Sequence, residues 1–468
     1  MVKAKPSFSS VMAISGFRYL WINQFLSQLA YNTLNFALII WVFKLTGSNF
    51  AVSILIFSVY LPSLLFGILG GVVADLADKK KILLIADFLY AISYFAFIFI
   101  RHSYPLIILN AFFLNSISQF FVPAESSSLP LVVPKDRLFF ANSLFSLTLY
   151  TALLIGFASA GPILTHLGIN AVFYTGFFVQ MIGVLLALNL PSIKSKLASP
   201  ESKRFLSEVN SAKHYLSLKT WRAFLSLTKE ETKQTFSFIK GRVTLSACII
   251  LLAAMQGMIG ILAVLVPAYL ERVLRIHATD ASYFMMMPLG LGMVLGAYLL
   301  GRFAHSLPRR TVVIPAIIMA GLIFLAIGIM PTIARSYEFS ELSARTRHLR
   351  YFSKAPSVAS WFGVGAFTLG LAAVSIIIPS QTTLQESTDE KVRGKILSVL
   401  VMLMNISSAI PVLLVGAFAD LFGVEPIFIL LGVVITITGI IALKPHRFFP
   451  EDLLPRRVKA FLGTGHWE

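Results

Sequence analysis

Long apolar segments separated by short polar ones run along almost the whole chain. Each is about 20 residues long, the helix length needed to cross the hydrocarbon core of a bilayer. Six lie on each side of a polar stretch at 191–243. Their limits are near 17–43, 49–73, 82–100, 104–122, 138–163, 170–190, 244–270, 281–301, 311–330, 358–379, 395–419 and 424–443. The pattern predicts an all-α membrane protein with 12 transmembrane helices in two six-helix bundles.

Composition and charge agree with a membrane protein. Of 468 residues, 57% are hydrophobic and 13% are charged, against about a quarter charged in soluble proteins. The net charge of +18 does not indicate a nucleic-acid-binding protein, because the basic residues recur between apolar segments. If the N-terminus is cytoplasmic, 30 of the 39 Lys and Arg residues fall on the cytoplasmic side. This bias predicts that both termini are cytoplasmic, in a multi-pass protein of the cell membrane.

An internal repeat supports two related halves. Residues 71–80 align with 301–310, which defines a first offset, and 123–137 align with 379–393, which defines a second, longer offset. The difference matches the length of a basic segment, 332–356, which we interpret as an insertion that forms a short amphipathic surface helix. The predicted domains are an N-terminal bundle (1–190), a basic cytoplasmic linker (191–243), a C-terminal bundle (244–445) and a cytoplasmic tail (446–468).

The loop "GVVADLADKK" (71–80) resembles the signature of the major facilitator superfamily. That signature runs Gly-x-x-x-Asp-Arg-x-Gly-Arg-Arg/Lys between the second and third helices. Gly71, Asp75, Lys79 and Lys80 match it, whereas Leu76 replaces the Arg, and Asp78 replaces the second Gly. Three more stretches are similar to the macrolide-efflux and siderophore-exporter-like branch. These are "FRYLWINQFLSQLA", "FVPAESSSLPLVVPKDRLFFANSLF" and "QTTLQESTDEKVRGKI".

The resemblance implies a conformational gate at this loop. Asp75 is expected to accept hydrogen bonds from the start of the eleventh span, near Arg393, where the helix dipole favours an anion. Gly71, Asp78, Lys79 and Lys80 complete the expected gate. The alternative is that the loop only sets membrane topology, which would explain the lysines but not Asp75.

Polar side chains inside the spans indicate a substrate cavity. Gln24, Gln28, Asn32 and Asn35 recur every three or four residues in the first span, so they share one helical face. Polar groups at this depth are costly unless they face protein or a wet cavity. Interhelical hydrogen bonds are the alternative for these residues and for three further candidates: Asn115, Gln119 and Gln256.

No carboxylate is expected near the middle of any span. The closest are Asp87 and Glu125, which are candidates for proton coupling, although Asp87 can equally be a structural partner for basic groups. The chain has no Gly-x-x-x-x-Gly-Lys-Ser/Thr motif and no paired histidines at metal-binding spacing. We therefore expect neither an enzyme nor a cofactor.

These observations favour a secondary transporter that exports a hydrophobic or amphipathic small molecule in exchange for protons. Expected partners are the substrate, protons and membrane lipids, without nucleic acid, and the protein is expected to be a monomer. One alternative is a transporter of lysophospholipids or other lipids. An alternative of another class is a scaffold or receptor that retains the fold without transport.

Overall fold

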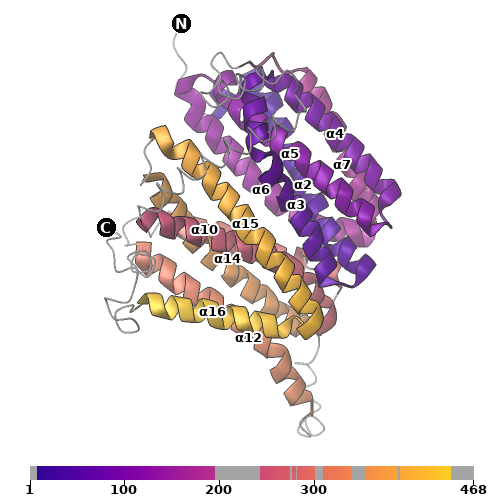
Figure 1. Ribbon diagram of the computed structural model, residues 1–468, viewed down its shortest axis with the longest axis vertical. Coiled ribbons are helices and arrows are strands. Elements are labelled where there is room, and N and C mark those ends of the chain that lie inside the picture. Colours follow the sequence, from indigo (N-terminus) through magenta and orange to yellow (C-terminus); the bar gives the residue numbers. More distant parts are fainter. Residues whose placement is uncertain are drawn as a thin grey trace, which may run out of the picture. The chain divides into compact units, whose positions relative to one another are not determined.

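The computed structural model is built from helices that follow the predicted spans (Figure 1). It describes residues 8–194, 243–274, 277–280, 282–300, 309–339, 355–386 and 390–443. Within these ranges every regular element is helical. After a short helix α1 (Phe8–Met12), the first half contains α2 (Ser15–Thr46), α3 (Asn49–Leu76), α4 (Lys79–Ile100), α5 (Tyr104–Val132), α6 (Leu138–His166) and α7 (Ile169–Leu188).

The second half has six further helices of at least 13 residues. They are α10 (Val243–Ala268), α11 (Met287–Leu299), α12 (Arg309–Phe339), α14 (Ala355–Glu386), α15 (Glu390–Phe422) and α16 (Glu425–Leu443). Among the described residues, 11 helices are long and apolar enough to span a membrane. The remaining predicted span, 281–301, corresponds to a shorter apolar helix, Phe284–Leu299, next to the undescribed residues 301–308.

The chain divides into two compact units. The first comprises Met1–Leu45 and Ser58–Thr232, and the second comprises Thr46–Phe57 and Lys233–Glu468. Helix α3 therefore begins in the second unit and continues in the first. The predicted limits of the linker and tail stay predictions, since residues 195–242 and 444–468 lie outside the described ranges.

Helix limits agree with the two offsets of the internal repeat. Helix α4 begins at Lys79 and helix α12 begins at Arg309. The number of residues between these two starts equals the first offset, the number between Gly71 and Gly301. Helix α6 ends at His166 and helix α15 ends at Phe422. The number of residues between these two ends equals the second offset, the number between Pro123 and Pro379. The proposed structural equivalence of Gly71 and Gly301 cannot be followed, because 301–308 lie outside the described residues.

The two halves also bring equivalent helices together. Glycines make each of these contacts close, since a side chain there would meet the neighbouring helix. In the first half the pairs are α2 with α6, α3 with α5, and α4 with α7; in the second they are α10 with α15, α11 with α14, and α12 with α16. The glycines, in the same order, are Gly156, Gly70, Gly183, Gly257, Gly292 and Gly439.

Two expectations about segment limits were wrong. Helix α5 runs to Val132 rather than ending near 122, because Pro123 and Pro130 are accommodated inside it. Glu125 therefore lies within a membrane-spanning helix and is buried. Residues 332–339 extend α12 instead of starting a separate surface helix. The rest of the predicted insertion, up to 354, is outside the described residues.

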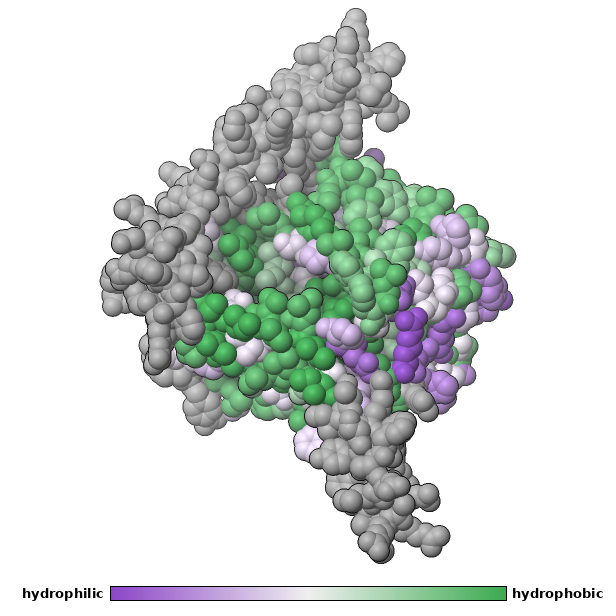
Figure 2. Space-filling model, turned by 60° about the horizontal axis from the view of Figure 1, so that its bottom comes forward, coloured by the Kyte–Doolittle hydropathy of each residue, from purple (hydrophilic) through white to green (hydrophobic). Residues whose placement is uncertain are grey.

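Apolar side chains cover much of the visible surface (Figure 2). The exposed residues of the chain include Phe88, Phe95 and Phe99 on α4 and Phe178 on α7, which are between 47% and 72% exposed. Exposed aromatic and aliphatic side chains at this density would be unfavourable in water. They indicate that these helices face lipid.

Candidate transport site and gates

A buried polar cluster lies between α2, α4 and α7 in the first unit. Nδ2 of Asn23 donates a hydrogen bond of 2.9 Å to Oδ2 of Asp87. The hydroxyl of Ser27 lies 3.3 Å from Oδ1 of Asn23 and 3.1 Å from Oε1 of Gln180. All four side chains are at most 5% exposed. The cluster links three helices through hydrogen bonds in an otherwise apolar region.

Gly183 makes room for this cluster. A Cβ atom at this position of α7 would lie 2.8 Å from Oδ1 of Asn23 and 3.3 Å from Cγ of Asp87. The absence of a side chain lets the carboxyl of Asp87 pack directly against the backbone of α7. Oδ1 of Asp87 has no hydrogen-bond partner among the described residues.

A cavity of about 100 Å³ adjoins the cluster inside the first unit. Ser27 and Gln180 belong to both, so the cluster connects the cavity with Asp87. The lining combines aromatic, aliphatic and amide groups. It consists of Ser27, Gln28, Tyr31, Tyr90, Tyr94, Leu114, Ser118, Phe121, Val122 and Gln180.

The four predicted polar residues of the first span have different surroundings. Gln28 lines the cavity. Gln24 instead bonds to α6, accepting from the hydroxyl of Thr148 at 3.0 Å. Asn32 is buried where Gly156 approaches, and Nδ2 of Asn35 donates to the carbonyl of Tyr31 at 2.9 Å.

Asn115 and Gln119 lie close to the cavity on α5. Oδ1 of Asn115 accepts a hydrogen bond of 2.6 Å from the hydroxyl of Tyr31, which lines the cavity. Gln119 donates to the carbonyl of Asn115 and to the hydroxyl of Ser118, at 3.2 and 3.0 Å. The other candidate, Gln256, is partly buried on α10 in the second unit.

Glu125 is the second buried carboxyl of the first unit. It is 5% exposed, and its Oε1 has no hydrogen-bond partner among the described residues. It lies one helical turn from the cavity-lining Phe121, whose ring contacts Tyr90 at a centroid distance of 5.7 Å.

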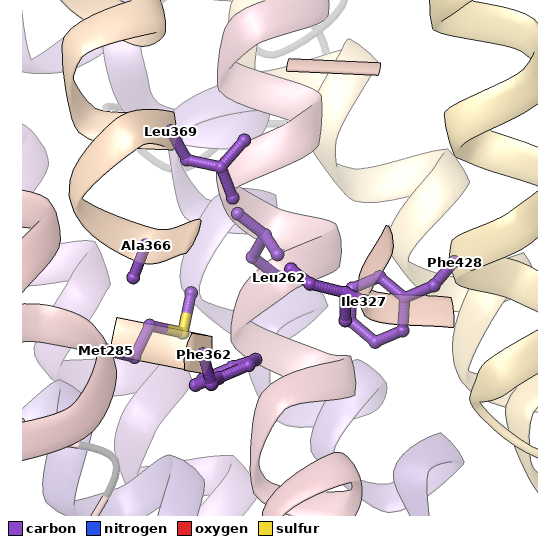
Figure 3. A pocket seen from close by; sticks show the side chains of 7 residues that line it. All are labelled: Leu262, Met285, Ile327, Phe362, Ala366, Leu369 and Phe428. Carbon is purple, nitrogen blue, oxygen red and sulfur yellow. The ribbon is translucent and has the colours of Figure 1, made fainter. Parts of the chain in front are cut away.

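The second unit has a small apolar cavity of about 10 Å³ (Figure 3). Its lining consists of Leu262, Met285, Ile327, Phe362, Ala366, Leu369 and Phe428. Tyr269 packs against Phe362 and Phe428 nearby, with ring centroids 5.4 and 5.2 Å apart. This space suits side-chain packing and offers no polar group to a ligand.

The loop between α3 and α4 is held within the first unit. Asp78 is the N-cap of α4 and accepts hydrogen bonds from the N–H groups of Lys80 and Ile193 and from the hydroxyl of Ser192, at 3.1, 3.0 and 2.6 Å. Partial burial acts to raise the pKa of Asp78, but these hydrogen bonds outweigh it, and the pKa lies below its usual value. Nζ of Lys79 bonds to the carbonyl of Ala74 at 2.8 Å.

Lys80 and Arg310 are aligned by the internal repeat and make equivalent contacts. Nζ of Lys80 donates to the carbonyl of Leu188, the last residue of α7, at 2.8 Å. Arg310 donates to the carbonyl of Leu443, the last residue of α16, at 3.1 Å. A cation at the C-terminus of a helix satisfies carbonyls that have no partner within the helix.

The predicted partner of Asp75 cannot be located in the described part of the chain. Residues 387–389 and the side chains around Arg393 are not described. Gly71 and Asp75 lie near the end of α3, as the motif predicts. The gate between them and the eleventh span stays a prediction.

A carboxylate caps a helix at the opposite end of α3, within the second unit. Asp420, near the end of α15, accepts hydrogen bonds from the backbone N–H groups of Asn49 and Phe50, at 2.9 and 3.0 Å. It also accepts from the hydroxyl of Ser48 at 2.6 Å and from Nδ2 of Asn49 at 2.9 Å. Arg272 approaches the carboxylate at 3.7 Å.

Asn23, Ser27, Gln180 and Asp420 were missed by the sequence analysis. Asn23 and Ser27 precede Gln24 and Gln28 by one position and are also one helical turn apart. This second polar pair on α2 was the available signal. The sequence gives no signal for what Gln180 and Asp420 contact, and only the fold shows it.

The fold agrees with comparisons to known proteins. A family model described as "Major Facilitator Superfamily" matches residues 20–340. The chain belongs to the Major Facilitator Superfamily. It is 22% identical to macrolide efflux protein A of Streptococcus pyogenes over 456 residues, which cover 93% of this chain and 97% of that protein.

Another relative and a solved structure are also similar to this chain. An uncharacterized MFS-type transporter, YfiS of Bacillus subtilis (strain 168), is 25% identical over 163 residues, which are 34% of this chain and 39% of that protein. A POT family peptide transporter of known structure superposes with a TM-score of 0.66 at 12% identity, covering 94% of this chain and 98% of that one. The superfamily membership identifies a multi-pass membrane transporter of small molecules rather than an enzyme.

Proposed function

We propose that this transporter exports a hydrophobic or amphipathic small molecule in exchange for protons, and that Asp87 carries the proton. The observation that carries the proposal is the chain of hydrogen-bonding groups that connects a buried carboxyl to a cavity. Asp87 is fully buried and reaches the cavity through Asn23, Ser27 and Gln180. The likeness to a macrolide efflux protein over nearly the full length supports export.

The cavity lining favours an amphipathic substrate. Tyr31 and Phe121 offer apolar ring surfaces, while Gln28 and Gln180 offer neutral hydrogen-bonding groups. Binding sites of this makeup bury the apolar part of a ligand and match its few polar groups. Small dianions would lack a compensating positive charge among the side chains that line the cavity, at a high desolvation cost.

Proton carriage follows from the surroundings of Asp87. An ionised carboxylate is costly in a region that excludes water, so the buried carboxyl holds its proton until water or substrate changes its surroundings. Asn23 supplies one hydrogen bond to the carboxyl, whereas Oδ1 of Asp87 has no partner among the described residues. Glu125 is a second candidate of the same kind, because it is also buried and its Oε1 has no hydrogen-bond partner among the described residues.

Alternating access needs contacts that form in one state and break in the other. We assign one of them to Asp420, whose four hydrogen bonds hold the first turn of α3. Since α3 belongs to both units, releasing this turn frees a helix that they share. The predicted contact of Asp75 with the start of the eleventh span would act at the other end of α3. We place the protein in the cell membrane as a monomer with both termini cytoplasmic.

Flux into proteoliposomes tests the proposal. We expect the wild-type protein to move radiolabelled erythromycin, a macrolide, against its gradient when a pH gradient is imposed. Asp87→Asn should abolish this pH-driven flux while the protein remains folded. The matched control is Asn110→Asp, which adds a carboxyl at a partly buried site on α5 that bonds to Ser93 instead of the cluster.

Other outcomes identify the alternatives. Flux of a lysophospholipid without dependence on the pH gradient would favour a lipid transporter. Specific binding without flux of erythromycin, a cationic dye or the lysophospholipid would favour a scaffold or receptor. Full pH-driven flux in Asp87→Asn would contradict the role of Asp87.

A further inference from the structure

The hydroxyl of Ser27 has two acceptors but one proton. Its oxygen lies 3.1 Å from Oε1 of Gln180 and 3.3 Å from Oδ1 of Asn23. A serine hydroxyl donates one hydrogen bond at a time. It can therefore donate towards the cavity, to Gln180, or towards the buried acid, to Asn23.

These two states differ in how strongly Asn23 bonds to Asp87. When Ser27 donates to Oδ1 of Asn23, it polarises the amide and makes Nδ2 a stronger donor to the carboxyl of Asp87. A stronger donor favours the ionised carboxylate over the protonated form, because charge-assisted hydrogen bonds are the stronger ones. When Ser27 donates to Gln180 instead, Asn23 is a weaker donor and the ionised carboxylate of Asp87 is less stabilised.

We propose that the Ser27 hydroxyl is a two-position switch that couples occupancy of the cavity to the proton on Asp87. A substrate with a hydroxyl or amine donor bonds to Oε1 of Gln180 and displaces the Ser27 hydroxyl. Ser27 then donates to Asn23, and Asp87 releases its proton. The inference rests on the proposed function and names the positioning residues that perform its coupling.

The direction of the coupling is that of an antiporter. If substrate binding favours the ionised form of Asp87, then a proton on Asp87 weakens substrate binding by the same factor, because coupling free energies are reciprocal. Substrate and proton therefore exclude one another from the first unit. The switch thereby accounts for exchange rather than cotransport and selects substrates that carry a hydrogen-bond donor.

Other titratable groups near Asp87 have to be separated from this effect. Glu125 on α5 and Tyr90 on α4 interact electrostatically with Asp87. On α7 the facing residue is Gly183, and on α2 the facing residues are Asn23 and Ser27; none of the three titrates. Measurements in a Glu125→Gln background remove the second carboxyl from the pH profile.

The chain provides a matched control on the same helix. Gln24 of α2 accepts a hydrogen bond from the Thr148 hydroxyl at 3.0 Å, as Gln180 accepts one from Ser27. Thr148 is buried to a similar extent as Ser27 but does not line the cavity. Thr148→Val therefore removes a buried hydroxyl that bonds to a glutamine without touching the route to Asp87.

The experiment measures the Kd of radiolabelled erythromycin for the purified protein between pH 5 and pH 8. In the wild type we expect binding to weaken about tenfold or more as the pH falls, which lies within the usual range of coupling between sites. Ser27→Ala should reduce this change to less than about threefold, and Thr148→Val should leave it at the wild-type value. Gln180→Met replaces Ser27→Ala if that variant does not fold.

The outcomes separate the inference from the proposed function. If Asp87→Asn removes the pH dependence but Ser27→Ala retains it, the switch is wrong and Asp87 remains the proton carrier. If Thr148→Val flattens the profile as much as Ser27→Ala does, the effect is one of packing around α2, and the switch is wrong. If Asp87→Asn retains the pH dependence, the proposed function itself fails.

Discussion

The contact between the third and sixth helices of each half is built on the same backbone and filled with different side chains. In the first half, Gly183 of α7 faces Asp87 of α4. The repeat aligns these two positions with Gly439 of α16 and Ile317 of α12, which also face one another. A Cβ on Gly439 would lie 2.5 Å from Cγ1 of Ile318 and 3.3 Å from Cγ2 of Ile317. The glycine is what the fold needs, and the residue opposite it is free to vary.

This difference separates structural requirements from functional ones. Close helix approach in a membrane depends on small residues, because lipid supplies no hydrophobic force to bring helices together. Both halves meet that requirement. The carboxyl and its amide partners occur at this contact in the first half, whereas Ile317 packs beside an apolar cluster that includes Val313, Ala316 and Ile376. Polar groups that are not required for helix packing at this contact are the best candidates for a role in transport.

The largest expected effect comes from placing the acid in the other half. Ile317→Asp would put a carboxyl among apolar side chains without the hydrogen bond that Asn23 gives to Asp87. Because Ile317 is partly buried, we expect a loss of about 1–3 kcal/mol in unfolding free energy, the cost of a polar group left without a hydrogen-bond partner. Thermal unfolding in detergent measures it.

A volume-conserving control separates charge from shape. Ile317→Leu should cost less than about 1.5 kcal/mol. If Ile317→Asp is as stable as the wild type, the polar partners around Asp87 are not needed to place a carboxyl at this contact. The difference between the two halves would then give no evidence for a functional role of Asp87.

The sequence predicts the fold better than the site, for a physical reason. Apolar length and the repeat offsets depend on many residues, so the loss of one signal does not remove the prediction. The predicted end of the fourth span was wrong, because Pro123 and Pro130 lie inside helix α5. The site depends on single contacts between distant segments, such as Asn23 with Asp87 or Ser27 with Gln180. No local pattern shows which polar residues of different spans will face one another.

The start of α3 offers a second test, with an intermediate effect. Asp420→Ala removes four hydrogen bonds from the first turn of α3; the repeat aligns Asp420 with Leu164, so the first half has no such acid at this position. Loss of a helix N-cap costs about 0.5–2 kcal/mol. We expect about a tenfold rise in the population with this turn released, measured by hydrogen–deuterium exchange of residues 46–57.

Asn49→Ala is the graded control, because it removes only the Nδ2 bond to Asp420 and leaves the Ser48 hydroxyl and the two backbone N–H donors. Its exchange should rise less than that of Asp420→Ala. Unchanged exchange in Asp420→Ala would remove Asp420 from the gate.

Asp78 gives a smaller effect with a defined pH dependence. The repeat aligns Asp78 with Pro308, so the second half has no carboxylate at this position. Asp78→Ala should cost about 1 kcal/mol of stability at neutral pH, the usual value of an N-cap. Because the folded-state pKa of Asp78 is lowered, its contribution is present above about pH 4, the unfolded value, and is lost as the pH falls through the folded pKa. Thermal unfolding of wild type and variant should therefore converge at the acid end.

The smallest effect tests the equivalence of the halves directly. Lys80 donates to the last carbonyl of α7, and Arg310 donates to the last carbonyl of α16. Each cation at a helix C-terminus is worth about 0.3–1 kcal/mol, so Lys80→Ala and Arg310→Ala should each lower stability by that amount. Because the two cations bond to different helices, α7 and α16, the double variant should show the sum of the single effects. High salt should reduce both losses, since it screens exposed charges. A loss in one variant without a loss in the other would mean that only one half uses this cap, and the equivalence would then hold for the backbone but not for the capping contacts.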